Sequence, residues 1–269
     1  MKFKTDFLKN YLKHAPAPLA LERSIECELL SQLEFKAPVL DIGCGEGLFA
    51  HILFNEKIDV GIDPDKKELE QCNKYEGYKE LIQCFGNNIP KESGSFNTVF
   101  SNSVLEHIPE IDEVLKEAHR LLTDSGKMYI TIPTNLFDNY SLIFQTLSFF
   151  KLRTLAEKYR IFFNKFWRHY HYYDVKNWKA KFEKNGFVVL NHREYNSKSM
   201  CLLNDFLVPF SLPCLISKKA TNEWILFPAL RNIFVQFLYP FFAPVYTANL
   251  KKDNNCGLVF FEISKTKLN

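Results

Sequence analysis

Three glycines at alternate positions are the residues whose types and spacing most clearly predict chemistry in this chain. Gly43, Gly45 and Gly47 follow the apolar run Val39-Leu-Asp-Ile42, and an apolar segment at 48–54 comes after them. A strand that enters a glycine turn and continues into a helix brings backbone N–H groups close to a ligand. The spacing therefore predicts a binding turn between a strand and a helix.

Two carboxylates flank this turn along the chain. Asp41 lies just before it, and Asp63 ends the apolar run Ile58-Asp-Val-Gly-Ile-Asp63. A carboxylate that ends the second strand, about 20 residues after such a turn, can accept hydrogen bonds from the hydroxyls of an adenosine ribose. Since Pro64 follows, Asp63 is also a candidate helix N-cap. The two roles are compatible.

The ligand class follows from the details of the turn. A dinucleotide-binding turn has the pattern G-x-G-x-x-G, and this chain has Leu48 where the last glycine belongs. This disfavours a nicotinamide-dependent oxidoreductase. The acidic Asp41 suits a cationic amino group better than a pyrophosphate. S-adenosylmethionine carries an ammonium and a sulfonium and no phosphate, so it fits the turn better.

Three histidines are candidate bases for removing a proton from a methyl acceptor. His107 follows the apolar run 96–101, which predicts a strand. His169 and His171 lie just before a predicted helix at 174–184. The alternative for each is a helix cap or a hydrogen bond to the backbone.

Strands alternate with helices along the first half of the chain, up to Pro133, which predicts an α/β fold with a doubly wound sheet. Such sheets bind ligands at the carboxyl ends of their strands, where the glycine turn lies. We expect strands at 39–42, 58–63, 81–85, 96–101, 127–132, 187–190 and 257–264, and helices at 19–34, 47–55, 64–73, 111–122 and 174–184.

The chain resembles class I S-adenosylmethionine-dependent methyltransferases, in particular the large group called type 11. The resemblance covers about residues 37–135 well and 169–190 more loosely. The segments that carry it are Asp41–Gly47, Gly61–Asp63, Ile89–Ile108 and Glu117–Pro133.

The resemblance implies a Rossmann-like seven-stranded sheet, mainly parallel with an antiparallel last strand and helices on both faces. It implies S-adenosylmethionine as the cofactor and no metal. Asp41, Gly43 and Gly45 would hold the methionine end and Asp63 the ribose, while Asn87 would stand where the family often has an acidic residue for adenine. The implied cofactor-binding residues are Asp41, Gly43, Cys44, Gly45, Asp63, Asn87, Asn102 and Leu105.

We expect one methyltransferase domain over 1–269. Its predicted parts are a cofactor-binding core at about 19–135, a lid or acceptor region at about 136–186, an apolar helical insertion at about 195–250, and the last strand at 257–264. The chain has 26 Phe, 12 Tyr and 3 Trp, crowded into its second half. They form either core packing or a groove that keeps water from the reaction.

The apolar stretch Trp224–Tyr246 holds one charge, Arg231, but Pro228 and Pro240 interrupt it. The uninterrupted part, 229–239, would span about 16 Å as a helix, against about 30 Å for a bilayer core. We therefore expect an amphipathic element that contacts a membrane surface or packs on the domain, rather than a transmembrane helix. A hydrophobic subdomain or a dimer face is the alternative. The sequence does not predict an oligomeric state.

Composition limits the remaining classes. The net charge is +3, and no RNA-binding motif accompanies the basic aromatic stretch 151–173, so nucleic acid is not an expected partner. Seven cysteines without C-x-x-C spacing predict neither a zinc site nor a disulfide framework. The N-terminus has no apolar signal region. We expect a cytoplasmic protein, not a secreted one, with peripheral contact at the inner face of a membrane.

Together these features predict a methyltransferase of the EC 2.1.1 class that methylates a small or lipid-like acceptor, at oxygen rather than at carbon or nitrogen. The alternative is a non-catalytic scaffold that docks on a membrane or a partner through 195–250.

Overall fold

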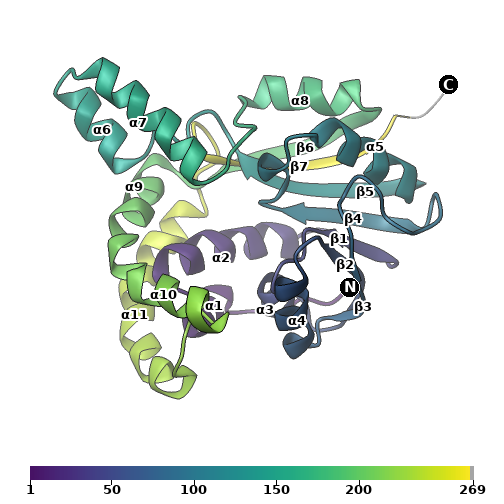
Figure 1. The fold of residues 1–269 in the computed structure, drawn as a ribbon, viewed down its shortest axis with the longest axis horizontal. Coiled ribbons are helices and arrows are strands. Elements are labelled where there is room, and N and C mark those ends of the chain that lie inside the picture. The colour runs from purple at the N-terminus through teal and green to yellow at the C-terminus, as the bar shows by residue number, and fades with distance from the viewer. Residues whose placement is uncertain (267–269) are drawn as a thin grey trace.

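One seven-stranded sheet forms the centre of the molecule (Figure 1). The structure is a computed structural model that describes residues 1–266, apart from the side chains of residues 228 and 229. The strand order is β3-β2-β1-β4-β5-β7-β6. The strands are β1 (Val39–Ile42), β2 (Ile58–Asp63), β3 (Tyr78–Gln83), β4 (Phe96–Asn102), β5 (Leu122–Pro133), β6 (Phe187–Tyr195) and β7 (Leu258–Lys265).

β7 alone runs against its neighbours, pairing antiparallel with both β5 and β6, while the pairs among β1 to β5 are parallel. This confirms the predicted Rossmann-like seven-stranded sheet, mainly parallel with an antiparallel last strand. The carboxyl ends of β1 and β4 are neighbours, because β1 pairs directly with β4. The loops after these two strands therefore meet at one edge.

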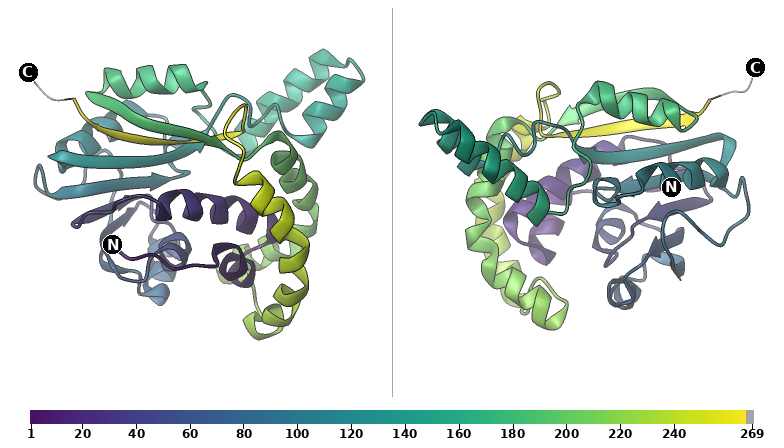
Figure 2. Two further views of the ribbon diagram at one scale, coloured as in Figure 1. Left: turned by 180° about the vertical axis from the view of Figure 1, so that it is seen from behind. Right: turned by 45° about the horizontal axis from the view of Figure 1, so that its top comes forward.

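Helices cover both faces of the sheet (Figure 2). One buried cluster joins α1, α2 and α3 to one face, and the other joins α5 and α8 to the opposite face. The helices are α1 (Phe7–His14), α2 (Ala17–Ser31), α3 (Leu48–Leu53), α4 (Lys66–Tyr75), α5 (Ile111–Leu121), α6 (Leu142–Phe149), α7 (Arg153–Phe166), α8 (Val175–Lys184), α9 (Lys198–Leu207), α10 (Leu212–Thr221) and α11 (Pro228–Asn249), with 3₁₀ turns η1 (Leu105–His107) and η2 (Pro209–Ser211).

The sequence pattern explains why these helices face the sheet as they do. In α5 the buried residues recur at helical spacing, and the first turn holds Asp112 and Glu113. Acidic residues there suit the positive end of the helix dipole. Burying each large apolar side chain of such a face contributes about 1.5–3 kcal/mol. The buried residues of α5 are Ile111, Val114, Leu115, Ala118 and Leu121.

Several predicted boundaries were wrong. β3 covers Tyr78–Gln83 rather than 81–85, because its register with β2 starts at Ile58↔Tyr78. β5 begins at Leu122 rather than at 127, because Leu122 pairs with Phe96 of β4 ahead of a register shift in this strand pair. β6 continues to Tyr195 because β7 pairs with it along its whole length. In each case pairing with a neighbouring strand outweighs local turn propensity.

The predicted helical insertion before the last strand is present as α9, η2, α10 and α11. The prediction that Pro240 ends a helix is wrong, since α11 is one helix of 22 residues with Pro240 and Pro244 inside it. Tertiary packing offsets the cost of these prolines: Val235, Phe242 and Tyr246 are buried, and the Tyr246 hydroxyl donates to the Ser24 carbonyl at 3.1 Å.

A test of length and hydropathy finds no single helix in residues 1–266 that could cross a membrane. One pair, Lys198–Leu207 with Pro209–Thr221, passes it only together, bent by 45°.

Candidate active site

The glycine turn after β1 has three left-handed residues. Gly43, Gly45 and Gly47 have φ of 82°, 52° and 79°. A Cβ on Gly43 would lie 2.5 Å from Val104 Cγ1, and one on Gly47 would lie 2.5 Å from Cys72 Sγ. A Cβ on Gly45 would meet nothing within 4 Å. Two of the glycines therefore permit close packing, and the middle one faces open space.

Backbone hydrogen bonds fix the turn against the end of β2. The N–H groups of Gly43 and Cys44 both donate to the Ile62 carbonyl at 2.9 Å. The Gly45 N–H donates to Asp63 Oδ2 at 3.0 Å, and the Asp65 N–H donates to Asp63 Oδ1 at 2.8 Å. Burial raises the pKa of Asp63, and these two donors oppose that rise. The N-cap of α4 is Asp65, whose side chain accepts from the Lys67 N–H, so Asp63 is not needed as a cap.

Asp41 is buried at the end of β1, with Oδ2 accepting from the Tyr78 hydroxyl at 2.6 Å. Burial raises the pKa of Asp41 to about 7, with a smaller contribution from the charge of Asp63. A cation bound nearby would favour the ionised form. A turn with open space at Gly45 and carboxylates at both strand ends therefore fits S-adenosylmethionine, which brings a cationic amine and two ribose hydroxyls.

The other predicted cofactor residues lie in different settings. Cys44 is buried in the turn, and Leu105 is fully buried in η1, which is part of the loop after β4. Asn87 is exposed after β3 and donates to Glu113 Oε2 at 2.9 Å. Asn102 has both ends of its amide engaged, donating to Glu26 Oε2 at 2.7 Å and accepting from the Thr131 hydroxyl at 2.8 Å. Asn102 thus connects α2 to the sheet.

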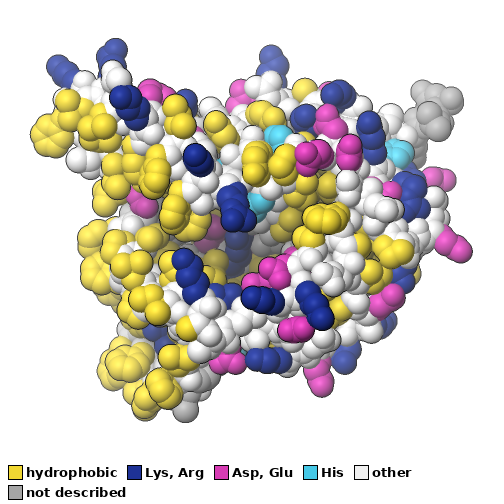
Figure 3. Space-filling model, in the orientation of Figure 1, with side chains coloured by type: hydrophobic (Ala, Val, Ile, Leu, Met, Phe, Trp, Pro, Cys, Tyr) yellow, Lys and Arg dark blue, Asp and Glu magenta, His cyan; other side chains and the backbone are white. Residues whose placement is uncertain are grey.

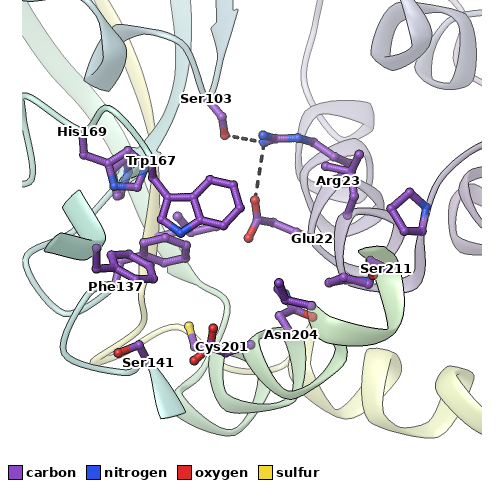
Figure 4. Close-up of a pocket in the computed structure, with 18 of the residues that line it drawn as sticks. Glu22, Arg23, Ser103, Phe137, Ser141, Trp167, His169, Cys201, Asn204 and Ser211 are labelled. Atoms are coloured by element: carbon purple, nitrogen blue, oxygen red, sulfur yellow. Dashed lines mark hydrogen bonds and ion pairs between the residues drawn. The ribbon is translucent and has the colours of Figure 1, made fainter. Parts of the chain in front are cut away.

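A cavity of about 370 Å³ opens beside the loop after β4 (Figure 4). This loop connects the two sites, because Val104 packs against Gly43 while Ser103, Glu106 and His107 line the cavity. The cavity wall is mainly apolar and aromatic away from the loop. Its apolar lining includes Leu19, Phe137, Phe163, Trp167, Val208, Leu212, Leu215, Trp224 and Leu258.

An ion cluster of half-buried Glu22 and Arg23 with fully buried Glu26 forms the polar end of the cavity. Arg23 Nη1 contacts both carboxylate oxygens of Glu26 at 2.8 Å, lies 3.8 Å from Glu22 Oε1 and donates to the Ser103 hydroxyl (Figure 4). Glu26 also accepts from the Tyr195 hydroxyl at 2.9 Å. Burial raises the pKa of Glu22 to about 7. Carboxylates therefore outnumber the guanidinium at this end.

Glu106 is a candidate that the sequence analysis missed. It lines the cavity, is only 3% exposed, and its Oε2 is buried with no hydrogen-bond partner. Burial raises the pKa of Glu106 to about 8. A carboxylate with such a pKa is matched to proton transfer near neutral pH. In the sequence, Glu106 stands directly before the predicted base His107, and this is the only local signal for it.

The three histidines separate into two groups. His107 and His169 both line the cavity, with ring centroids 5.2 Å apart. Burial lowers the pKa of His107, and burial with the charge of His107 lowers that of His169 to about 4. Both are therefore neutral near pH 7. His171 does not line the cavity: Nδ1 lies 2.9 Å from the Tyr173 hydroxyl and Nε2 lies 2.9 Å from the Ile108 carbonyl.

The helical insertion also contacts the glycine turn. Lys218 Nζ lies 2.5 Å from Glu46 Oε2 and 3.2 Å from Glu68 Oε2. The Trp224 indole N–H donates to Glu46 Oε1 at 2.8 Å. Glu46 stands within the turn and Trp224 lines the cavity, so this cluster joins the turn, the insertion and the cavity wall.

Comparison with known proteins places this geometry among methyltransferases. A family model described as a methyltransferase domain matches residues 11–192. The chain is 27% identical over 144 residues to the malonyl-acyl-carrier protein O-methyltransferase of Legionella pneumophila, covering 49% of this chain and 51% of that protein. It is 29% identical over 107 residues to the ubiquinone biosynthesis O-methyltransferase of Pelagibacter ubique, covering 38% and 44%.

A similar fold occurs in a solved structure from Thermotoga maritima, described as an S-adenosylmethionine-dependent methyltransferase and possible histamine N-methyltransferase. The two folds align with a TM-score of 0.56 at 16% identity, covering 91% of this chain and 89% of that one. The chain spans about half the length of the two curated relatives above. The family match ends before α9, so the insertion and β7 lie outside it.

Proposed function

The chain belongs to the methyltransferase domain family, its cofactor is S-adenosylmethionine, and we propose that it methylates an amphiphilic acceptor held in the cavity beside β4. One observation carries the proposal. The loop after β4 packs on the glycine turn through Val104 and lines the cavity with Ser103, Glu106 and His107. An acceptor in the cavity would therefore lie next to the cofactor that the turn holds.

The turn would hold the cofactor as the family resemblance implies. Asp63 would accept from the ribose hydroxyls, and its two backbone donors already fix its orientation. Open space at Gly45 leaves room for the methionine end, near the buried Asp41. Asn87 would accept from the adenine amino group through its carbonyl oxygen, since its N–H₂ group donates to Glu113.

Bound S-adenosylmethionine supplies an electrophilic methyl group: the acceptor–carbon bond forms as the sulfur–carbon bond breaks, and the sulfur keeps the electron pair. The protein's own contribution is to orient the acceptor, exclude water and take up its proton. Glu106 Oε2 is buried at the cavity wall without a partner, so it would accept that proton. His107 and His169 are the alternative bases for taking up this proton, and both are neutral near pH 7.

The acceptor chemistry follows from the two ends of the cavity. Its polar end, around Glu22, Arg23 and Glu106, suits a hydroxyl or another protic group, and oxygen is our proposed acceptor atom. The remaining wall is aromatic and aliphatic, which favours a lipid-like body. The comparisons do not support the scaffold alternative, because the curated relatives are named as methyltransferases, acting at oxygen, carbon or nitrogen.

We also propose a division of labour within one domain. The core at about 19–135 would hold the cofactor, and the lid region at about 136–186 would close the acceptor site with α7. The insertion at about 195–250 would complete the cavity wall from the other side, and β7 would complete the sheet. Cavity-lining residues from both regions, Trp167 and Leu212 among them, support this division.

A labelling experiment tests the acceptor class. The chain is incubated with methyl-tritiated S-adenosylmethionine and with separated membrane and soluble fractions of the cells that express it. We expect label in the lipid extract of the membrane fraction, dependent on Glu106. Label confined to water-soluble products would contradict the amphiphilic acceptor.

A further inference from the structure

Exposed apolar side chains are concentrated on one side of this molecule. Most large hydrophobic residues with more than a third of their surface exposed lie on α6, on α7, on the run from α9 through η2 and α10 to α11, and on the short segments that flank these helices. Figure 3 shows them along the edge formed by these helices. The exceptions in the described part of the chain are Phe85, Tyr170, Tyr172, Val188 and Leu190.

Two helical units that are far apart in sequence build this surface. α6 and α7 contribute one half and the segment from η2 to α11 the other, and Phe149 and Phe237 are 80% and 73% exposed. We call the surface the apolar rim. Its most exposed members are Phe149, Phe150, Ile161, Phe162, Phe166, Phe210, Ile216, Phe227, Phe234, Phe237 and Phe241.

The apolar rim is continuous with the cavity. On α7, Ile161 and Phe162 face solvent while Phe163 lines the cavity. On α10, Leu212 and Leu215 line the cavity and Ile216 is exposed. The same short helices therefore present apolar side chains outward and inward, and whatever covers the rim also lies next to the cavity wall.

Positively charged residues beside the apolar rim favour an anionic partner. Residues 151–168 contain six Lys or Arg and one acid, Glu157, which pairs with Arg160 at 3.0 Å. α11 contains no acidic residue. Exposed Phe and Ile on short amphipathic helices, with cations alongside, are typical of elements that lie in a membrane interface. Cations near the surface are attracted to anionic lipid.

We propose that the apolar rim docks on an anionic lipid bilayer and presents the cavity to it, so that the acceptor enters from the lipid phase. The entry of the acceptor rests on the proposed function. The docking itself does not, because it depends only on the rim and its cations. A second copy of the chain or a protein partner is the competing occupant.

Vesicle flotation of the full chain tests the docking. Vesicles of phosphatidylcholine with phosphatidylglycerol are compared with vesicles of phosphatidylcholine alone, and we expect tighter binding to the anionic ones. Phe149→Ser with Phe150→Ser, and Phe237→Ser with Phe241→Ser, should each weaken binding by about tenfold or more. The matched control is Val188→Ser with Leu190→Ser, exposed apolar residues on the edge strand β6, which should bind as the parent does.

The cations give an independent readout. Lys158→Gln and Lys165→Gln should each weaken binding to anionic vesicles by about fivefold and leave binding to neutral vesicles unchanged. Raising the salt to about 0.5 M should reduce the difference between the two vesicle types.

Three outcomes would overturn the docking proposal: a folded parent that floats with neither vesicle, rim variants that float as well as the parent, or a concentration-dependent dimer that the rim variants abolish without any vesicle binding. The last outcome would show that the rim binds a second copy of the chain.

Titration of the same proteins with S-adenosylmethionine separates this proposal from the proposed function. Rim variants should keep cofactor affinity, and a parent that floats without binding the cofactor would refute the function and leave the docking intact.

Discussion

The glycine turn and the cavity beside β4 differ in how they are built. The turn is short, and backbone hydrogen bonds to Ile62 and Asp63 hold it, with glycines where a Cβ would collide. The cavity is larger, and side chains from α2, α7, α9 and α10 form its wall. A site made of backbone within one strand–turn–helix unit depends on local sequence. A site made of side chains from distant helices depends on how those helices pack.

Because of this difference, we expect substitutions to affect the binding of the cofactor and the reaction of the proposed acceptor separately. Changes in the turn should lower cofactor affinity and leave the acceptor pocket intact. Changes in the cavity should lower turnover and leave cofactor affinity intact.

Replacing Glu106 should give the largest effect on catalysis. Glu106→Gln keeps the shape of the side chain and removes the proton acceptor, so we expect kcat to fall by about 10²–10⁴-fold. Cofactor affinity, measured by calorimetry, should stay unchanged. Because burial raises the pKa of Glu106 to about 8, the parent's rate should increase with pH up to about 8 and then level off. A parent profile that is flat from pH 6 to pH 9 would contradict the assignment.

Among the substitutions in the turn, replacing Asp63 should weaken the binding of the cofactor most. Asp63→Ala removes the ribose acceptor and leaves the Gly45 and Asp65 N–H groups without theirs. Hydrogen bonds to charged groups contribute about 1.5–3 kcal/mol, so we expect the Kd for S-adenosylmethionine to rise by about 100-fold. Asp65→Ala is the control, since it removes only the cap of α4, at a cost of about 1 kcal/mol in stability. If both variants lost the same affinity, the loss would come from the altered start of helix α4 and not from a missing hydrogen bond to the ribose.

Adding a methyl group at Gly45 should be a milder test of the turn. Gly45 has φ of 52° and Gly94 has φ of 68°, and a Cβ meets nothing within 4 Å at either position. Both Ala variants should therefore lose similar stability, about 1–2 kcal/mol. Only Gly45→Ala should lose cofactor affinity, by about tenfold, because its methyl occupies the ligand space. Calorimetry and thermal melting of the pair separate strain from binding.

Releasing the insertion from the turn should have a smaller effect. Lys218→Ala removes the half-buried bridge to Glu46 and Glu68. We expect the Km for the acceptor to rise a few-fold, about 1 kcal/mol, with cofactor affinity nearly constant. Lys219→Ala on the same helix, exposed in the structure, is the matched control. A larger change in cofactor Kd than in acceptor Km would show that Lys218 serves the turn and not the cavity.

Glu106 also predicts a pH dependence of stability. Its ordinary pKa of 4.5 rises to about 8 in the folded chain, so the folded state binds its proton more tightly than the unfolded state. The resulting stabilisation is fully present below pH 4.5 and is lost as the pH rises through 8. Glu106→Gln stays neutral at every pH, so it does not lose this stabilisation. The Tm of the variant minus the Tm of the parent should therefore increase as the pH rises from 5 to 9. A constant difference in Tm across this range would show that Glu106 keeps an ordinary pKa.

The two regions also differ in how far sequence alone predicted them. Gly43, Gly45, Asp41 and Asp63 could be predicted as site residues because their spacing along the strands and the turn is a local pattern in the sequence. Glu106 was missed because its importance comes from burial without a partner, which no local pattern reveals. Residues Glu22 and Arg23, on α2, entered the site only through its packing against the loop after β4.

The ends of the helices show the same contrast between features set by local sequence and features set by tertiary packing. α5 matched its prediction closely, because its apolar residues recur at helical spacing. The end of α11 could not be predicted, because Pro240 and Pro244 remain helical only where Phe242 and Tyr246 pack into the core. Tertiary contacts determine the end of α11, and they also determine which helices line the cavity.

A crystal structure of the chain with S-adenosylmethionine tests the central claim most directly. We predict that the ribose hydroxyls contact Asp63, that the methionine end lies over Gly45, and that the sulfonium methyl points into the cavity toward Glu106. A cofactor bound at the turn with its methyl directed away from the cavity, or bound outside the turn, would contradict this account.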